Sequence, residues 1–161
     1  MKKIEVIAVS NEFVPVRASK GAAGYDVKAN IPEGVLEIKP GEKALIDLGV
    51  KVHLGNPNMA IHLMPRSGLS TKKELILLNS VGLVDSDYQG TIKACFKNLS
   101  NETVKINHLD RVAQLVFVPV VIVDDQIELV ETFSDETERS IGGFGSTGLQ
   151  FTGINYNTKG L

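Results

Sequence analysis

The sequence has few of the residues that build covalent cross-links or metal centres. Cys95 is its one cysteine, so an intrachain disulfide framework is excluded. The three histidines, His53, His62 and His108, are scattered, and with a single thiol they do not give the ligand spacing of a zinc site. We therefore expect no metal centre built from protein side chains.

An excess of positive charge is also lacking. Lys and Arg number 17 against 19 Asp and Glu, which gives a formal net charge of −2. Such a chain offers no broad positive field to a nucleic-acid duplex, so duplex binding is not expected. Any anionic ligand has to be held by a few cationic groups gathered at one place.

Long apolar runs are absent as well. No run reaches the length that crosses a membrane. Lys2 and Lys3 are followed by Ile4-Glu5-Val6 rather than by the apolar region of a signal peptide. We expect a soluble protein of the cytoplasm that does not bind membranes, and its 161 residues suit one compact domain.

The pattern that is present is an alternation of apolar and other residues. From residue 44 to residue 54 every second residue is apolar, which predicts one strand with a buried face. The same alternation recurs around Ile61, Ala94 and Leu115, and turn-forming residues separate these runs. Many short strands with close turns favour an all-β sandwich or barrel. Only residues 71–76 are predicted to form a turn or two of helix.

The end of the chain differs in composition. Six of the 15 glycines lie in the final 23 residues, where few residues could build a core. We predict a β-domain over residues 1–138 and a flexible arm over residues 139–161.

Two segments carry residue types suited to chemistry on a nucleotide. Residues 79–90 run from an apolar stretch into two carboxylates and an aromatic ring, so Asp85 is a candidate base. Asp, Ser and Gly are also ordinary hairpin residues, and a polar turn is the alternative interpretation. Residues 65–70 place Arg66 beside a hydroxyl and a glycine, which suits phosphate oxygens, although a loop arginine often makes only a surface contact.

Three further segments are weaker alone. An Asp-Arg pair that opens a strand, as in residues 110–114, is commonly structural. Residues 139–148 offer an aromatic ring, hydroxyls and many backbone N–H groups, but no Lys-Ser or Lys-Thr follows the glycines, so this segment is not a P-loop. Residues 21–26 lack the glycine spacing of a dinucleotide fingerprint and alone indicate only a tight turn.

Taken in order, these segments resemble the five motifs of the homotrimeric deoxyuridine triphosphatases, the dUTPase family. The matching segments are Ala23–Ala29, Pro65–Ser70, Gly82–Gly90, Asp110–Gln114 and Arg139–Gly148. Ser140 departs from the pattern, because the family usually has glycine after the arginine of the fifth motif. The tail from Leu149 to Leu161 extends past the usual end of the family and has no assigned role.

The resemblance implies a jelly-roll-like β fold and three chains around a threefold axis, with sites shared between subunits. It also implies that the protein hydrolyses dUTP to dUMP and pyrophosphate with Mg²⁺, which keeps uracil out of DNA and supplies dUMP for dTMP synthesis. A metal chelated by three phosphates needs few protein ligands, which agrees with the lack of a metal-binding cluster.

The resemblance also assigns roles to individual residues. Asp85 would be the general base that activates the attacking water, and Asp26 would support the site. The phosphates would be bound by Arg66, Ser67, the backbone N–H of Gly68, Gln114 and Arg139. Uracil would be read by Asn79 and the backbone of Gly82, Leu83 and Val84, while Tyr88 would crowd out a 2′-hydroxyl. In the arm, Phe144 would stack on the base and Gly145, Ser146 and Thr147 would bind substrate.

Two other functions remain open at this point. The dCTP deaminases share the architecture but use a glutamate that activates water, and the matching position falls at or near Cys95, where there is no carboxylate. A nucleotide-sensing regulatory protein could use the same pocket without turnover. Such a protein would not need the set of Asp85, Arg66, Gln114 and Arg139, in which a base faces a phosphate site.

Overall fold

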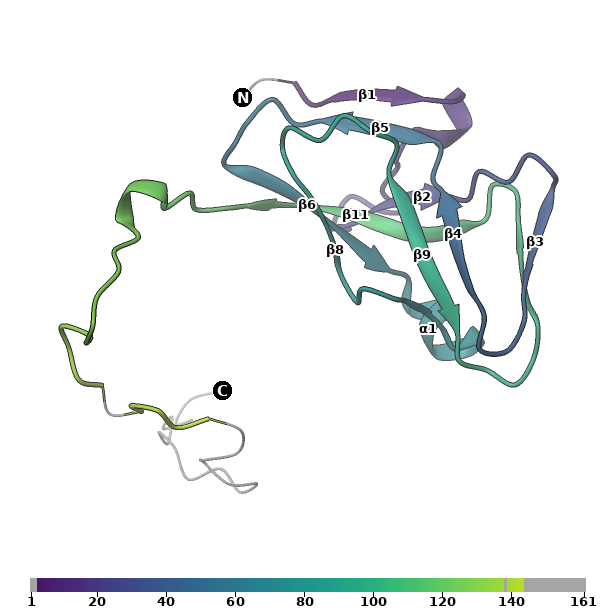
Figure 1. Cartoon of the computed structure of the whole chain (residues 1–161). Helices are drawn as coiled ribbons and strands as arrows, with labels where there is room; N and C mark the ends of the chain where they lie inside the picture. Colours follow the sequence, from purple (N-terminus) through teal and green to yellow (C-terminus); the bar gives the residue numbers. More distant parts are fainter. Residues whose placement is uncertain (1–2, 138, 144–161) are drawn as a thin grey trace, which may run out of the picture. The chain divides into compact units, whose positions relative to one another are not determined.

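The computed structural model describes residues 3–137 and 139–143. The chain divides into two compact units, Met1–Ile122 and Val123–Leu161. The first unit contains all the strands found in the described part of the chain, as Figure 1 shows. They are β1 (Glu5–Ala8), β2 (Tyr25–Lys28), β3 (Val35–Ile38), β4 (Lys43–Asp47), β5 (Val50–His53), β6 (Met59–Pro65), β7 (Leu75–Leu77), β8 (Gly82–Val84), β9 (Lys93–Asn98), β10 (Val104–Asn107) and β11 (Arg111–Pro119).

The strands of the first unit form four small antiparallel sheets. The largest has the order β2-β11-β6-β8, and a second has the order β4-β9-β7. Two further pairs join β1 to β5 and β3 to β10. Among residues 3–137 and 139–143, helical structure is limited to α1 (Ser67–Lys73) and two short 3-10 turns, η1 (Asn11–Phe13) and η2 (Asp124–Gln126). The all-β prediction is therefore confirmed for the residues that the structure describes.

The core follows the alternation predicted from the sequence. In β9, Ala94 and Phe96 are fully buried, while Lys93 is exposed and Cys95 is only partly covered. Leu115 of β11 and Ile61 of β6 are also fully buried. Strand β9 thus gives one face to the core, as the period of two requires.

The single strand predicted over residues 44–54 is wrong, because the chain bends at Gly49. Gly49 has a φ of +64°, and its N–H donates to Asp47 Oδ1 at 2.6 Å. A Cβ on Gly49 would lie 2.5 Å from Cδ1 of Phe13, so the close packing of this ring also requires glycine. Residues before the bend pair with β9, and residues after it pair with β1. The buried face is continuous through the bend, which is why the alternation alone did not reveal it.

The helix predicted over residues 71–76 is displaced. It begins at Ser67 and ends at Lys73, and Glu74 follows in the left-handed region with a φ of 49°. Leu75 and Leu77 are then buried in β7, which pairs with β9. Burial of these two leucines on one side of an extended chain outweighs the local preference for helix.

In the second unit, residues 139–141 form a turn. The backbone N–H of Ser140 donates to the carbonyl of Thr137 at 3.0 Å, and Arg139 Nε donates to the carbonyl of Gly142 at 2.9 Å. Ser140 has a φ of 44°, a conformation that favours glycine. The arm boundary at residue 139 stays a prediction.

Candidate active site

The first candidate site is a hollow of about 650 Å³ in the first unit, which we call the arginine hollow. It lies where β2, β11 and the start of α1 come together. Its lining includes Gly24, Asp26, Arg66, Ser67, Gly68, Arg111 and Gln114. The structure therefore brings together the residues predicted from the second and fourth motifs, and Asp26 from the first.

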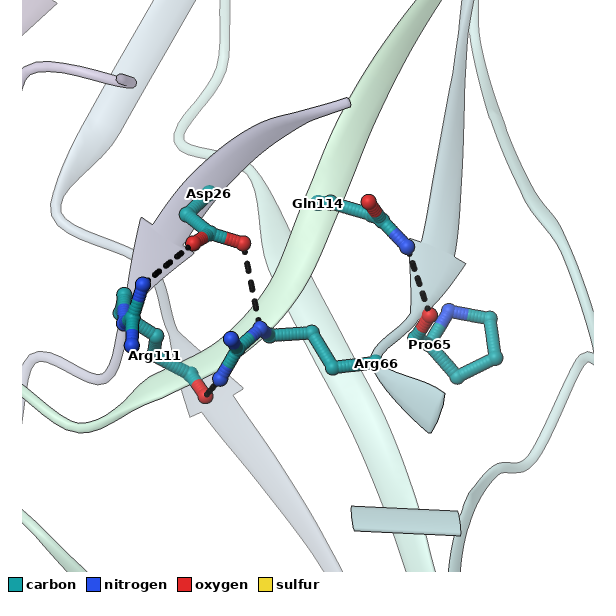
Figure 2. A network of polar contacts seen from close by, with 5 residues as sticks. All are labelled: Asp26, Pro65, Arg66, Arg111 and Gln114. Atoms are coloured by element: carbon teal, nitrogen blue, oxygen red, sulfur yellow. Dashed lines mark hydrogen bonds and ion pairs between the residues drawn. The ribbon is translucent and has the colours of Figure 1, made fainter. Parts of the chain in front are cut away.

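Asp26 organises the arginine hollow, as Figure 2 shows. The residue is only 8% exposed, and its carboxylate binds two guanidinium groups. Arg66 Nε lies 3.1 Å from Oδ1, and Arg111 Nη1 lies 2.9 Å from Oδ2. Arg66 Nη1 also donates to the carbonyl of Arg111 at 3.0 Å. Two fixed cations with one carboxylate leave a net positive charge, which suits an anion with several oxygens.

A bulge in β11 places Arg111 and Gln114 in the same hollow. Residues three apart in a regular strand point to opposite faces. In β11 the register with β2 shifts between Arg111, which faces Lys28, and Ala113, which faces Val27. The extra residue turns the strand, so both side chains line the hollow.

Gln114 is held at both ends of its amide. Nε2 donates to the carbonyl of Pro65 at 3.1 Å, as drawn in Figure 2. The side chain also lies against Gly24, where a Cβ would be 2.9 Å from Cδ of Gln114. Close packing against this glycine and the bond to Pro65 leave Gln114 little freedom to move.

Lysines surround the rim of the arginine hollow. Lys72 and Lys73 line it from the last turn of α1, and Lys105 lines it from β10. Lys105 Nζ lies 2.7 Å from a carboxylate oxygen of Glu37. Their hydrogen bond, with the attraction of their charges, lowers the pKa of Glu37 and raises the pKa of Lys105. Lys105 therefore stays charged, and the carboxylate of Glu37 balances its charge.

The second candidate site is a smaller hollow of about 290 Å³, which we call the Tyr88 hollow. Its lining is Leu83, Val84, Asp85, Tyr88, Thr91, Ile92 and Lys93. Tyr88 Oη donates to the carbonyl of Thr91 at 3.1 Å, and the backbone N–H of Tyr88 donates to the carbonyl of Asp85 at 3.2 Å. Asp85 is exposed, as a base that receives a water molecule needs to be.

The residues predicted to read a base lie on or beside β8. Gly82 is buried, and a Cβ there would lie 3.4 Å from Nδ2 of Asn79, so the Asn79 amide sits next to this strand. Leu83 is 63% exposed. The structure thus brings Asn79 to β8, which leads directly into the Tyr88 hollow.

The two hollows lie at opposite ends of the β6–β8 pair. Val84 pairs with Ile61 across the two strands. Ile61 precedes Arg66 by five residues, so about 17 Å of extended chain separates Val84 from Arg66. Asp85 continues away from Arg66, because β8 is antiparallel to β6. One chain therefore does not bring its Asp85 to its own Arg66.

Arg139 belongs to the second unit, where it closes the turn described above. Phe144, Gly145, Ser146 and Thr147 lie outside the described residues. Sequence reasoning missed Arg111 as a site residue. The signal in the sequence was the Asp-Arg pair at the start of β11, which is equally typical of a structural ion pair. What distinguishes Arg111 is its ion pair with Asp26, which the sequence does not reveal.

Comparison with known proteins decides the family. The dUTPase family model matches residues 11–148, which include all five motifs. The chain belongs to the dUTPase family. A dUTPase of Haemophilus influenzae, a deoxyuridine 5'-triphosphate nucleotidohydrolase, is 47% identical over 155 residues, with 93% of this chain and 100% of that protein covered. The corresponding protein of Francisella tularensis is 44% identical over 150 residues, with 91% and 99% covered.

Solved dUTPase structures share the fold. A mutant dUTPase of Staphylococcus bacteriophage 80alpha, bound to dUpNHpp, is 27% identical with a TM-score of 0.80, over 92% of this chain and 100% of that one. The dUTPase of Streptococcus mutans is 34% identical with a TM-score of 0.68, over 76% and 99%. A mutant dUTPase of S. aureus phage phi11, described with a structural Mg(II) ion, is 26% identical with a TM-score of 0.72, over 83% and 100%. The jelly-roll prediction for this dUTPase is confirmed.

Proposed function

We propose that this dUTPase hydrolyses dUTP to dUMP and pyrophosphate in the cytoplasm, which removes a precursor of uracil in DNA and supplies dUMP for dTMP synthesis. The observation that carries the proposal is the buried Asp26 with its two arginines, because it creates an anion site in a chain that also offers an exposed carboxylate beside an aromatic ring.

Asp85 acts as the general base. In the described part of the chain no Lys, Arg or His lies within ion-pair distance of its carboxylate, so it is free to orient a water molecule and accept its proton. The water attacks the α-phosphorus, and the bond from that phosphorus to the bridging oxygen of the β-phosphate breaks. Such a base contributes about 100 to 10,000-fold in rate.

The arginine hollow binds the phosphates and stabilises the negative charge that develops on the pyrophosphate leaving group. Arg66 presents a guanidinium already fixed by Asp26, and Gln114 has a second amide hydrogen beyond the one used by Pro65. Ser67 and Gly68 are exposed at the start of α1 and offer a hydroxyl and a backbone N–H. Groups fixed in advance stabilise developing charge without having to reorganise. Arg139 and the arm residues Gly145, Ser146 and Thr147 complete the set.

Magnesium fits this donor set when it is held by the substrate. Among residues 3–137 and 139–143 no group of three or more His, Cys, Asp or Glu side chains could hold a metal ion. When bound through the triphosphate, Mg²⁺ neutralises phosphate charge and polarises the reacting group. The chain itself then binds and orients the chelate through Arg66 and Gln114.

The nucleoside is selected at the Tyr88 hollow. Asn79 and the backbone of Gly82, Leu83 and Val84 pair with the uracil edge, and Phe144 stacks on the base. The ring of Tyr88 packs against the deoxyribose and leaves no room for a 2′-hydroxyl.

The active sites are shared between the subunits of a homotrimer. The separation of about 17 Å along β6 supports this, because a water on Asp85 and the phosphates on Arg66 must lie within one substrate molecule. Asp85 of one chain therefore works with Arg66 of a neighbour.

Mixing two inactive variants tests the shared site. We expect Asp85→Asn chains and Arg66→Gln chains each to be nearly inactive alone. In an equal, refolded mixture a site has a one-half chance of an intact Asp85 and, independently, a one-half chance of an intact Arg66 from the neighbouring chain. About a quarter of the sites should therefore be active. Native mass measurement establishes that mixed trimers form. A site within one chain gives activity no greater than that of the two parents.

Pyrophosphate release from dUTP, dCTP and dTTP, with and without Mg²⁺, tests the activity itself. We expect rapid release from dUTP alone, and only with the metal. Ammonia from dCTP would support a deaminase instead, although the position that matches its glutamate falls at or near Cys95 of β9, where there is no carboxylate. Tight binding of dUTP without turnover would support a nucleotide sensor.

Within the described residues, no helix is long and apolar enough to span a membrane.

A further inference from the structure

Gly90 lies directly beneath the ring of Tyr88. A Cβ on Gly90 would lie 2.5 Å from Cζ and 3.0 Å from Cε2 of this ring, and closer still to the hydroxyl. The clash is with a rigid ring rather than with the end of a flexible chain, so the whole ring would have to move. An alanine at position 90 is therefore incompatible with the present place of Tyr88.

The backbone gives no other reason for glycine at position 90. Among the described glycines, positive φ values occur at Gly34, Gly41, Gly49 and Gly55, and Gly90 is not one of them. The φ at position 90 therefore does not itself require glycine. The ring of Tyr88 is the neighbour that excludes a side chain there.

Tyr88 has few other supports. Its side chain is 45% exposed, and its hydroxyl is fixed by the one bond to the carbonyl of Thr91. Gly90 lies between Tyr88 and Thr91 in the sequence, so the segment from Tyr88 to Thr91 contacts the ring at two places. The absence of a side chain at Gly90 lets the ring pack close to the backbone, and the hydrogen bond to Thr91 orients its hydroxyl.

We infer that Gly90 is a positioning residue for sugar selection: its missing side chain lets Tyr88 lie where the ring excludes a 2′-hydroxyl. This inference rests on the proposed function, in which Tyr88 packs against deoxyribose. A displaced ring no longer forms a fixed wall, so discrimination between deoxyribose and ribose falls while the phosphate contacts of the arginine hollow remain.

The test compares Gly90→Ala with Gly21→Ala. Gly21 is exposed, has no atom within 4 Å of an added Cβ and has no positive φ, so it is a matched control. We expect Gly90→Ala to lower the ratio of kcat/KM for dUTP over UTP by about tenfold. Gly21→Ala leaves this ratio unchanged, and both variants keep the melting temperature of the parent.

A double variant separates positioning from a general structural effect. Once Tyr88→Ala has removed the ring, adding Gly90→Ala has nothing left to displace, so the ratio does not fall further. The inference would be overturned if Gly90→Ala lowered the ratio in the Tyr88→Ala background by the same factor as in the parent protein. An unchanged ratio in the single variant Gly90→Ala would overturn it as well.

Binding measurements distinguish this inference from the proposed activity. The relative affinities for dUpNHpp and its ribonucleotide counterpart, measured by calorimetry, report sugar selection without turnover. If the parent protein releases no pyrophosphate from dUTP, the proposed activity fails, yet the affinity ratio still tests Gly90. If the parent turns over dUTP and Gly90→Ala keeps the full affinity ratio, only the role of Gly90 fails.

Discussion

The arginine hollow and the Tyr88 hollow hold their side chains by different means. In the first, a nearly buried carboxylate binds two guanidiniums, and Gln114 is bonded across to the end of β6. In the second, Asp85 is exposed on a loop and Tyr88 rests on one glycine and one backbone bond. The difference shows one hollow whose side chains are held by several ion pairs and hydrogen bonds and another with few supports. In the proposed function the first binds the phosphates and the second receives the nucleoside.

Removing the base acts on the Tyr88 hollow alone and has the largest expected effect. Asp85→Asn fills the same space but cannot accept a proton, so kcat for dUTP falls by about 100 to 10,000-fold. Because Asp85 is exposed, the melting temperature stays the same. A kcat near that of the parent protein would show that another group is the base.

Neutralising Asp26 acts on the arginine hollow. Asp26→Asn leaves two guanidiniums facing an amide, and we expect the free energy of unfolding to fall by about 2 kcal/mol, less than for a fully buried pair because the arginine side chains are 32% and 49% exposed. The KM for dUTP rises because Arg66 loses its support. Urea unfolding and steady-state kinetics measure the two effects.

Glu37→Gln is the control for that experiment. It removes a carboxylate that forms an exposed pair with Lys105 at this rim and does not itself line the hollow. We expect no measurable change in unfolding or in KM. Equal effects of Asp26→Asn and Glu37→Gln would contradict a special role for the buried carboxylate.

Crowding Gln114 sharpens the comparison further. Gly24→Ala crowds the Gln114 amide and displaces it from its bond to Pro65, so the KM values for dUTP and UTP both rise by severalfold, up to about tenfold. Their ratio stays constant, because the sugar is read at the other hollow. A changed ratio in Gly24→Ala would mean that the two hollows are not independent.

Replacing Ser140 has the smallest expected effect. Ser140→Gly relieves the backbone strain of a φ of 44°, which stabilises the turn. Glycine also increases the conformational entropy of the unfolded chain, so the two effects on the free energy of unfolding nearly cancel. We expect the KM for dUTP to change by less than about twofold. Ser140→Pro cannot adopt this φ and lacks the N–H that bonds to Thr137, so its KM rises clearly. Equal KM values for the two variants would show that this turn has no part in binding.

Much of the β-domain could be predicted from local patterns. Alternation identified the buried faces around Ala94 and Leu115, and turn residues separated the strands. The bend at Gly49 was missed because the buried face runs through it unbroken. The helix was misplaced because pairing of β7 with β9, a distant segment, decides where the helix ends.

The sequence by itself determined the period of each strand, the punctuation between strands and the order of the five motifs, since these depend on neighbouring residues. Only the tertiary structure decided which strands pair and in which register. That register buries Asp26 between Arg66 and Arg111 and sends Asp85 to the opposite end of β6 from Arg66. The physical reason is that alternation specifies which face of a strand is buried, whereas the partner and the register follow from the packing of the whole core.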